Sequence, residues 1–296
     1  MDHSYLLLTT LCTALAAASA PAGSQTLQKV RDTNQITVSY REASVPFSYL
    51  LSPTKPVGFA VDLTELIVDD LRKSLHRPYL RVTYKPVSAQ NRIPLLVEGA
   101  YDLECGSTTN TAARGKDVAF SISYFYAGTR LLARKDSGIR DFGDLAGKRV
   151  ATVTGSTNEK VLLAYAAEHD MPVEVLRAKD YLESFDLVDS GRAAALALDD
   201  VILFGLRANA RDPALLQVVG NALQVEPYGC MVRRDDAEFK KVVDRAIARA
   251  MKTGEFSRLY AKWFESPIPP RGANLEMQMS AALKANMVKL SDKPAN

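Results

Sequence analysis

The chain has 296 residues, 47% of them hydrophobic and 24% charged, and its formal net charge is +3. This composition is typical of a globular protein with one large core or two ordinary ones, and it excludes disordered and collagen-like chains. The charge is small and spread along the sequence, with no basic stretch interleaved with aromatic residues, so nucleic acid is not an expected partner.

The N-terminus begins with an uncharged, apolar segment at residues 5–20 (YLLLTTLCTALAAASA). It is too short for a comfortable membrane span and ends in small residues, which predicts a secretory signal peptide over residues 1–22. The Ala-Pro-Ala sequence at 20–22 offers a cleavage site before Gly23. The positive charge usual before such a segment is weak, because only His3 could supply it, and a buried N-terminal helix is the alternative. We expect a mature protein that is exported to the periplasm.

The first half of the mature chain alternates strand-like and helix-like segments. Strands are predicted at 36–41, 80–87 and 101–106, and helices at 60–75 and 91–99. The helix at 60–75 (AVDLTELIVDDLRKSL) is indicated by apolar residues at helical spacing. Two strand–helix units followed by a strand make half of a doubly wound α/β domain.

The same alternation then repeats in the second half. Strands are predicted at 128–134, 148–153, 173–177, 193–198 and 227–233, and helices at 157–168, 181–191, 201–208, 235–252, 254–264 and 275–289. The proline-rich stretch 267–270 ends the helix before it. We therefore predict two similar α/β lobes, joined where the chain crosses between them near 122–128 and 221–228.

Charged and hydroxyl residues collect where predicted strands end. Arg41 ends the first strand, Arg92 begins the helix after the second, and Arg114 lies shortly after the third. Two similar loops, 106–110 (GSTTN) and 155–158 (GSTN), follow strands in the first and second lobes. Because ligands bind between α/β lobes at the carboxyl ends of their strands, we expect these residues to face a shared cleft.

These residue types suit a zwitterion. A carboxylate is held by the planar guanidinium of arginine and by N–H and hydroxyl groups at a helix N-terminus. An ammonium needs a carboxylate, which Asp199, at the end of the strand 193–198, would supply. Three arginines exceed what one carboxylate needs, so the surplus indicates a second carboxylate on the ligand.

Each feature also has a simpler interpretation. An arginine at a strand end is often a solvated surface group, a Gly-Ser-Thr sequence is often a plain helix N-cap, and Asp199-Asp200 would also cap the next helix. The binding-site hypothesis rests on their coincidence at the same end of both lobes.

At these residues the chain resembles a known family, from about residue 26 to 267–270. It is similar to the periplasmic amino-acid-binding proteins of ABC importers (solute-binding protein family 3), and within them to the glutamate/aspartate-binding members. The matching motifs are REASVPFSY (41–49), AQNRIPLL (89–96), YDLECGSTTN (101–110), GTRLLARK (128–135), GSTNE (155–159), SGRAAALALDD (190–200), YGCMVRRDD (228–236) and KWFESPIPP (262–270).

The resemblance implies a two-lobed type II periplasmic-binding-protein fold, in which each lobe is a mostly parallel sheet flanked by helices. Lobe I would comprise residues 23–123 and 226–296, and lobe II residues 124–225. In this fold the strands carrying Cys105 and Cys230 are neighbours, so the resemblance also implies a disulfide between them. An exported protein permits such a bond.

The resemblance further assigns roles to residues. Arg114 would hold the ligand α-carboxylate with Ser107, Thr109 and Thr157, Asp199 would hold the α-ammonium, and Arg41 and Arg92 would hold the side-chain carboxylate. Ser156, in the second loop, belongs to the predicted site as well. The ligand is therefore expected to be glutamate or aspartate, and the partners to be the membrane permease subunits of an ABC importer. We expect a monomer without a cofactor.

Two positions depart from the family pattern. Tyr181 stands where the family has a histidine, and Ala89 stands where it has a serine, although the neighbouring Ser88 offers a hydroxyl. Tyr181 keeps a hydroxyl donor but loses any positive charge. Glutamate, aspartate and a related dicarboxylate therefore stay open as ligands.

Two other functions compete. A dehydratase on the same fold would need a base, but His76 and His169 lie in polar stretches away from the arginines, and no metal-ligand cluster or glycine-rich phosphate loop occurs. A binding protein that serves a sensor would use the same pocket. Import remains the preferred function, and an enzyme is not expected.

Overall fold

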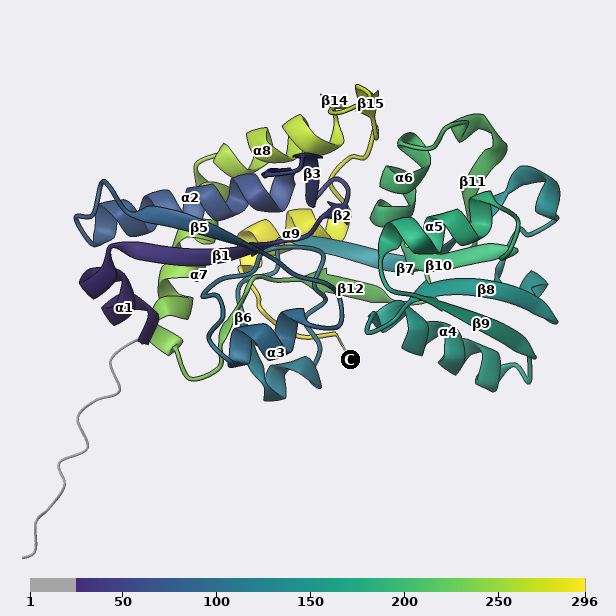
Figure 1. Cartoon of the computed structure of the whole chain (residues 1–296), viewed down its shortest axis with the longest axis horizontal. Helices are drawn as coiled ribbons and strands as arrows, with labels where there is room; N and C mark the ends of the chain where they lie inside the picture. The colour runs from purple at the N-terminus through teal and green to yellow at the C-terminus, as the bar shows by residue number, and fades with distance from the viewer. Residues whose placement is uncertain (1–24, 296) are drawn as a thin grey trace, which may run out of the picture.

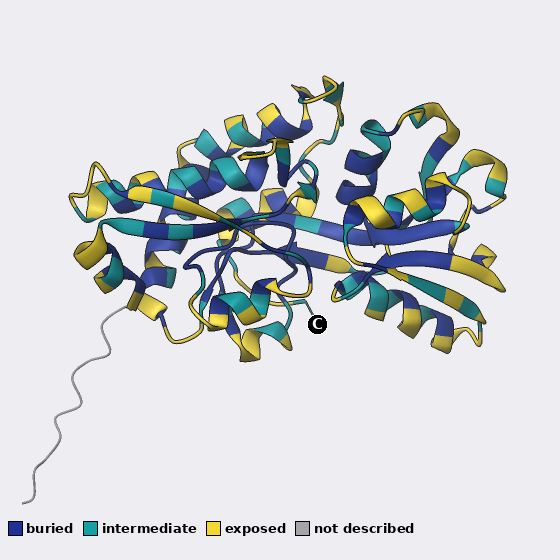
Figure 2. Ribbon diagram, viewed as in Figure 1, coloured by how far each residue is buried: buried dark blue, intermediate teal, exposed yellow. Residues whose placement is uncertain are grey.

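The computed structural model describes residues 25–295, so the predicted signal peptide and its cleavage site lie outside the described residues. The elements gather into two bodies, joined by strands that run from one to the other (Figure 1). We call the body that contains the described N-terminus lobe I and the other lobe II. Figure 2 shows buried strands at the centre of lobe II with exposed residues on its outer helices.

Four elements of lobe I lie close to predicted ones: β1 (Gln35–Tyr40), α2 (Phe59–Ser74), β5 (Arg81–Pro86) and α3 (Arg92–Val97). Three others were not predicted: α1 (Gln25–Thr33), the short η1 (Arg114–Lys116) and β6 (Val118–Phe120). Strands β1 and β5 are parallel, with Val38 opposite Tyr84. Helix α2 buries its apolar stripe, including Leu63 and Ile67, which explains the helical spacing of its sequence.

The predicted strand at 101–106 is wrong as a continuous element. Leu103 pairs in parallel with Val38 of β1, whereas the next residue, Glu104, pairs in antiparallel with Met231. The segment thus passes from one neighbour to another within two residues. It leads directly into the first Gly-Ser-Thr loop.

A small antiparallel sheet was not predicted. It consists of β2 (Ala43–Ser44), β3 (Ser48–Ser52) and β4 (Lys55–Val57). Its first two strands are too short to leave a periodic pattern, since only Ala43–Tyr49 and Ser44–Ser48 pair between them. This sheet places Ser44 and the buried Phe47 beside the junction of the lobes.

Lobe II is built on one sheet of order β11-β7-β10-β8-β9. Its elements are β7 (Phe125–Arg134), η2 (Lys135–Ser137), η3 (Phe142–Leu145), β8 (Lys148–Val153), α4 (Thr157–Glu168), β9 (Val173–Ala178), α5 (Tyr181–Asp189), β10 (Ala195–Asp199), α6 (Asp200–Ala208), η4 (Pro213–Leu215) and β11 (Leu216–Val219). Strands β8, β9 and β10, which alternate with helices, are parallel, whereas β7 is antiparallel to β10 and β11. The carboxyl ends of β8 and β10 therefore meet at one edge of the sheet, and α4 and α6 begin there.

The two segments predicted as crossings pair with each other. Strand β12 (Val225–Tyr228) runs antiparallel to the start of β7, with Glu226 opposite Ala127. The single strand predicted at 227–233 is two strands, because β13 (Met231–Arg233) leaves β7 and pairs with β6 instead. The chain changes partner at Gly229-Cys230, between the two strands.

The predicted disulfide is present. Cys105 and Cys230 are joined with their Cα atoms 4.2 Å apart, across a sequence separation of 125 residues. The bond ties the approach to the first Gly-Ser-Thr loop to the segment between β12 and β13. A disulfide that closes so long a loop typically contributes about 3–5 kcal/mol to stability.

An aromatic cluster packs under the crossing strands. The ring of Phe47 lies 5.0 Å from that of Phe125 and 5.3 Å from that of Tyr228, both in edge-to-face geometry. Phe59 and Phe264 complete the contacts of Phe47. Such pairs stabilise by about 0.5–1.5 kcal/mol each beyond their buried area. These ring contacts pack the crossing strands against lobe I.

The C-terminal elements return to lobe I. They are α7 (Ala237–Lys252), α8 (Glu255–Phe264), β14 (Pro267–Ile268), β15 (Ala273–Asn274) and α9 (Ala281–Lys289). The helix predicted at 275–289 begins only at Ala281, because Ser280 caps it by accepting a hydrogen bond from Leu283 N. None of the helices in the described part of the chain has the length and apolar character needed to cross a membrane.

Candidate ligand-binding site between the lobes

Arg41 enters the cleft from the end of β1. Its backbone is fixed by Ser48, whose hydroxyl accepts from Arg41 N at 2.8 Å and donates to Arg41 O at 3.0 Å. The buried guanidinium lies over the ring of Tyr181 of lobe II, 5.1 Å from its centroid. Burial lowers the pKa of Arg41, but a guanidinium stays charged at neutral pH.

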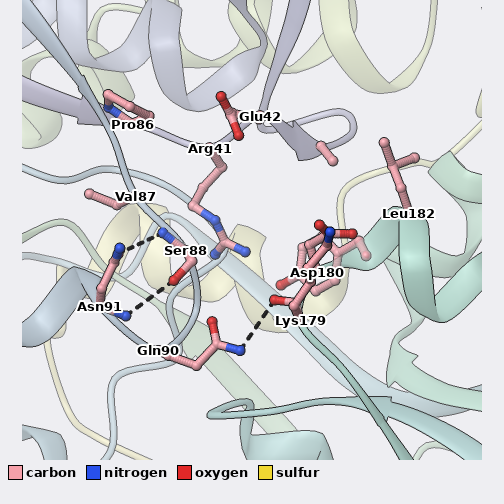
Figure 3. Close-up of a pocket in the computed structure, with 12 residues that line it drawn as sticks. Arg41, Glu42, Pro86, Val87, Ser88, Gln90, Asn91, Lys179, Asp180 and Leu182 are labelled. Atoms are coloured by element: carbon pink, nitrogen blue, oxygen red, sulfur yellow. Dashed lines mark hydrogen bonds between the residues drawn. The ribbon is translucent and has the colours of Figure 1, made fainter.

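Arg41 also lines a pocket of about 570 Å³ at one mouth of the cleft. Figure 3 shows its side chain extending into this pocket, with Ser88 and Gln90 of lobe I on one side and Asp180 of lobe II on the other. Gln90 reaches across the cleft and donates to the carbonyl of Lys179 at 3.2 Å. The hydroxyl oxygen of Ser88 accepts from Asn91 N at 3.2 Å, and its proton stays available for a further hydrogen bond.

Arg92 approaches the cleft from the start of α3. Its Nη1 donates to Thr108 Oγ1 at 2.7 Å and to the carbonyl of Ser107 at 3.3 Å. Tyr101 holds the backbone there by donating to Arg92 O. Arg92 is therefore a buried cation anchored to the first Gly-Ser-Thr loop.

Glu104 supplies a counter-charge that the sequence analysis missed. It is fully buried and accepts a hydrogen bond from Thr108 Oγ1 at 2.9 Å. Burial raises the pKa of Glu104, while the positive charges of Arg92 and Arg41 oppose the rise. A Cβ at Gly106 would lie 2.6 Å from Glu104 Oε1, so a larger residue there would have to displace this carboxyl group.

Ser107 links the two lobes through hydroxyl groups. Its Oγ lies 2.8 Å from Ser44 Oγ and 3.1 Å from Tyr181 Oη. The loop that carries Ser107 is held by Tyr124, whose hydroxyl accepts from Gly106 N and donates to Gly106 O. Tyr181 thus uses its hydroxyl where the family pattern has a histidine.

Arg114 spans the cleft at its other end. One terminal nitrogen donates to the carbonyl of Thr109 in lobe I at 2.9 Å, and the other to the carbonyl of Gly155 in lobe II at 3.2 Å. Burial, together with the like charge of Arg92, lowers the pKa of Arg114 to about 10. It therefore remains a cation at neutral pH, with N–H groups left for a carboxylate.

The N-terminus of α4 faces Arg114 from lobe II. Ser156 is its N-cap and accepts from Glu159 N, so this predicted site residue has the structural role that a Gly-Ser-Thr sequence commonly has. Thr157 follows, and its hydroxyl lies 3.3 Å from that of Thr109. The unpaired N–H groups of the first helical turn and the helix dipole both favour a negative group here.

Asp199 ends β10 on the lobe II side. It is buried, and its Oδ2 accepts from Asn158 Nδ2 at 3.1 Å. Burial, and then the negative charge of Glu226, raise the pKa of Asp199 well above its ordinary value. A cation placed beside Asp199 would relieve both effects.

Glu226 was also missed. It lies fully buried on β12, and its carboxylate accepts from the hydroxyls of Thr109 and Thr157, each at 2.5 Å. A glutamate inside an apolar strand segment (QVEPYGC) was the available signal. The hydrophobic periodicity of the sequence identifies residues of the core, so it did not identify Glu226, whose carboxyl group faces the junction of the lobes.

Five buried polar atoms at the junction have no hydrogen-bond partner among the described residues: Arg41 Nη1, Arg92 Nε, Glu104 Oε2, Asp199 Oδ1 and Tyr228 Oη. Buried polar groups are normally paired, so these atoms are available to a polar ligand. Within residues 25–295 no group of three or more His, Cys, Asp and Glu side chains has a metal-binding arrangement. The predicted site residues lie at the junction of the lobes, where Arg41 and Tyr181 line one pocket and Arg114, Ser156 and Thr157 line another.

Comparison with known proteins decides the family. The pattern of bacterial extracellular solute-binding proteins, family 3, matches residues 36–266 of the chain. The chain belongs to this family.

The solute-binding protein has close curated relatives. It is 46% identical to the L-glutamate/L-aspartate-binding protein of Pseudomonas aeruginosa strain PAO1, over 98% of this chain and 97% of that protein. It is 42% identical to the glutamate/aspartate import solute-binding protein of Escherichia coli strain K12, again over 98% and 97% of the two chains. Both relatives are named as binding proteins.

A solved structure confirms the fold of the solute-binding protein. It matches the crystal structure of the P235GK mutant of ArgBP from T. maritima with a TM-score of 0.72 and 27% identity, over 81% of this chain and 99% of that one. The two-lobed type II architecture implied by the resemblance is therefore correct.

Proposed function

We propose that this solute-binding protein captures glutamate or aspartate outside the cytoplasm and delivers it to the permease of an ABC importer. The observation that supports this most directly is the charge arrangement of the cleft. Three arginines, Arg41, Arg92 and Arg114, approach from lobe I, and Asp199 lies buried on the opposite side. The names of the curated relatives, which are glutamate/aspartate-binding proteins, agree with it.

In this proposal each charge of the ligand has a partner. Arg41 and Arg92, whose Nη1 and Nε atoms are unpaired among the described residues, hold the side-chain carboxylate. Arg114 and the first N–H groups of α4 hold the α-carboxylate, and Asp199 holds the α-ammonium. Tyr181 lies at the side-chain end, and Ser107, which the resemblance assigns to the α-carboxylate, contacts its hydroxyl. A ligand without the second carboxylate would leave two buried arginines unpaired, at a cost of a few kcal/mol.

The ligand bridges the lobes in this arrangement. We place the boundaries of lobe I at residues 23–123 and 226–296 and those of lobe II at 124–225, so that the paired strands β7 and β12 form the hinge. Because the ligand contacts both lobes only when they meet, it binds the closed state better, and this difference drives closure.

Calorimetry tests the ligand class. We expect mature protein to bind glutamate or aspartate as a 1:1 complex, and glutamine and asparagine at least about tenfold more weakly. Equal binding of glutamine and glutamate would contradict the acidic ligand while leaving the family membership intact. A related dicarboxylic amino acid belongs in the same screen, since Tyr181 and Ala89 depart from the family pattern.

Export and assembly complete the proposal. We propose that residues 1–22 are removed and that the periplasmic protein is a monomer. Mass spectrometry of the exported protein should find an N-terminus at or near Gly23, and light scattering should give the mass of one chain. A mature protein that keeps residues 5–20 would instead be anchored by them.

A further inference from the structure

Glu226 lies at the junction of both lobes and the hinge, yet no ligand contact is assigned to it. It is fully buried on β12, opposite Ala127 of β7. The first binding loop runs beside it, because Asn110 N donates to the carbonyl of Pro227 and Thr109 pairs with Tyr228. Thr157, at the start of α4, reaches the same carboxylate from lobe II.

Two threonine hydroxyls share one oxygen of the Glu226 carboxylate. Thr109 Oγ1 and Thr157 Oγ1 each lie 2.5 Å from Glu226 Oε2. An ionised carboxylate only accepts hydrogen bonds, and a threonine hydroxyl has one proton to donate. Each threonine therefore gives its proton to Glu226. What these hydroxyl oxygens can still offer is lone pairs, which suit a cation with N–H groups and not a carboxylate.

Glu226 is also connected to Asp199. Thr129 donates to Asn158 Oδ1 at 2.6 Å, and the Asn158 amide donates to Asp199 Oδ2 at 3.1 Å. Thr129 Oγ1 also lies 3.4 Å from Glu226 Oε1, but its one proton is donated to Asn158. The two carboxylates are therefore coupled by charge, since the negative charge of Glu226 contributes to the raised pKa of Asp199.

Asp199 leaves room for a cation. Its Oδ1 accepts no hydrogen bond of normal length among the described residues, and the buried hydroxyl of Tyr228 lies near it as the one further donor. Arg114 is the nearby cation, but its two terminal nitrogens are directed at the carbonyls of Thr109 and Gly155. The acceptors that remain are one carboxylate oxygen and two hydroxyl oxygens, and the ammonium group has three N–H donors.

We propose that Glu226 is a positioning residue for the α-ammonium of the ligand: by taking the hydroxyl protons of Thr109 and Thr157, it turns both oxygens into acceptors that act with Asp199. This inference rests on the proposed function, because it assumes an amino acid in the cleft. It revises the expectation that the two threonine hydroxyls help to hold the α-carboxylate. The α-carboxylate then depends on Arg114 and the backbone N–H groups of α4.

The decisive experiment compares glutamate with glutarate, which is glutamate without its amino group. Calorimetry or high-concentration NMR titration measures both ligands with wild-type protein and with Glu226→Gln. A glutamine amide can donate a hydrogen bond to the threonine oxygens, so these hydroxyls are no longer held as acceptors for the ligand ammonium. We expect Glu226→Gln to weaken glutamate binding by about tenfold or more and glutarate binding by less than about threefold, the size of one charge-assisted hydrogen bond.

Glu104→Gln is the matched control, because Glu104 is a second buried glutamate that lies among the arginines. Glu104→Gln should change the affinities for glutamate and for glutarate by the same factor. If Glu226→Gln also weakens both ligands equally, Glu226 has only a structural role and the inference is wrong. If wild-type protein binds no acidic amino acid, the proposed function fails, and the inference fails with it.

A second measurement uses the threonine itself and remains available if Glu226→Gln does not fold. Thr157→Ser keeps the hydroxyl and should bind glutamate within about threefold of wild type, whereas Thr157→Val should lose about tenfold for glutamate and little for glutarate. In a folded Glu226→Gln background, Thr157→Val should cost less than about threefold, because the oriented hydroxyl is already lost. Equal losses for the two ligands in Thr157→Val would contradict the inference.

Discussion

The two sides of the cleft differ in the charge that they bury. Lobe I contributes the guanidinium groups of Arg41, Arg92 and Arg114 and the carboxyl group of Glu104, whereas lobe II contributes the carboxyl group of Asp199, with Glu226 of the hinge strand nearby. Arg41 and Arg114 have lowered pKa values and Asp199 a raised one, because burial penalises the charged form on each side. Neither side is well satisfied alone, and a zwitterion with an extra carboxylate complements both.

The two sides also differ in how they hold their charges. The arginines carry a counter-charge of their own, since Glu104 lies beside Arg41 and Arg92 and accepts from Thr108. Asp199 has amide and hydroxyl partners, and the like charge of Glu226 raises its pKa, while Arg114 is the one cation of the described site that acts on it. Because both terminal nitrogens of Arg114 also donate to backbone carbonyls, Asp199 is less well neutralised than the arginines of lobe I.

The largest effect is expected from Asp199→Asn, which removes the lobe II charge. The α-ammonium would lose its only direct carboxylate, at a cost of about 3–5 kcal/mol of binding, or a hundredfold to several thousandfold in Kd. Calorimetry with glutamate measures the loss, and small-angle scattering measures closure, which should weaken. Asp200→Asn is the matched control, because Asp200 Oδ1 accepts from the backbone N–H groups of Val201 and Gly128 and has no cleft role. Unchanged glutamate affinity in Asp199→Asn would refute the charge assignment.

A substitution of a lobe I arginine should weaken the binding of acidic amino acids much more than that of neutral ones, so it should change selectivity. Arg92→Gln removes a cation assigned to the side-chain carboxylate, so glutamate should bind about 2–3 kcal/mol more weakly while glutamine loses much less. The ratio of the two Kd values is the measurement. Arg134→Gln, which breaks an exposed ion pair with Asp136 in lobe II, should leave the ratio as it is. A ratio that stays constant in Arg92→Gln would show that this arginine does not face the second carboxylate.

Closure of the lobes can also be tested at a contact that involves no charged group. Gly205 lies inside α6 of lobe II, and a Cβ there would lie 2.4 Å from the carbonyl oxygen of Val45 in lobe I. Alanine is favoured over glycine within a helix, but the clash should disfavour the closed state by about 1–2 kcal/mol. We expect Gly205→Ala to bind glutamate about five- to thirtyfold more weakly.

The control for this substitution is Gly143→Ala. Gly143 is exposed in lobe II, and an added Cβ would meet nothing within 4 Å. Glutamate affinity should equal that of wild type in this variant. If Gly205→Ala also binds like wild type, the contact between α6 and Val45 does not limit closure.

The smallest effect should come from pH. Asp199 must be ionised to pair with an ammonium, and its pKa in the folded chain is raised above the ordinary value of 3.8. Glutamate affinity should therefore fall as the pH is lowered through that raised pKa, by at most about tenfold per pH unit. Calorimetry across this range should show the fall in wild type and not in Asp199→Asn.

The stability of the ligand-free protein should change in the opposite direction. A carboxyl group whose pKa is raised by folding binds its proton more tightly in the folded state, so its contribution to stability falls as the pH rises from 3.8 through the raised pKa. The difference in unfolding free energy between wild type and Asp199→Asn should therefore shrink as the pH is lowered. A difference independent of pH would mean that Asp199 titrates normally.

Much of the architecture follows from local patterns in the sequence. The helix predicted at 157–168 coincides with α4, Thr157–Glu168, because its cap, its first-turn acid and its apolar positions are all adjacent in sequence. The helices α2 and α5 and the parallel strands of lobe II were predicted for the same reason. The strand at 101–106 and the helix at 275–289 were not correct as written, since Leu103 and Glu104 pair with different strands and Ser280 sets a later start.

The sequence predicted most of the residues of the candidate site, but not the hydrogen bonds and ion pairs that they make with one another. Charged and hydroxyl side chains at strand ends identified Arg41, Arg92, Arg114 and Asp199, because α/β lobes gather such ends into one cleft. The sequence by itself thus determined the fold class, the family and the cations that lie at the junction of the lobes.

Only the tertiary structure showed which groups share protons and charge. Glu226 is 117 residues from Thr109 and 69 residues from Thr157, yet both hydroxyls donate to it. Ser156, by contrast, uses its side chain within its own helix. Strand pairing between β7 and β12 brings Glu226 to the cleft, and a hydrogen bond depends on distance and direction in space, which separation along the chain does not encode.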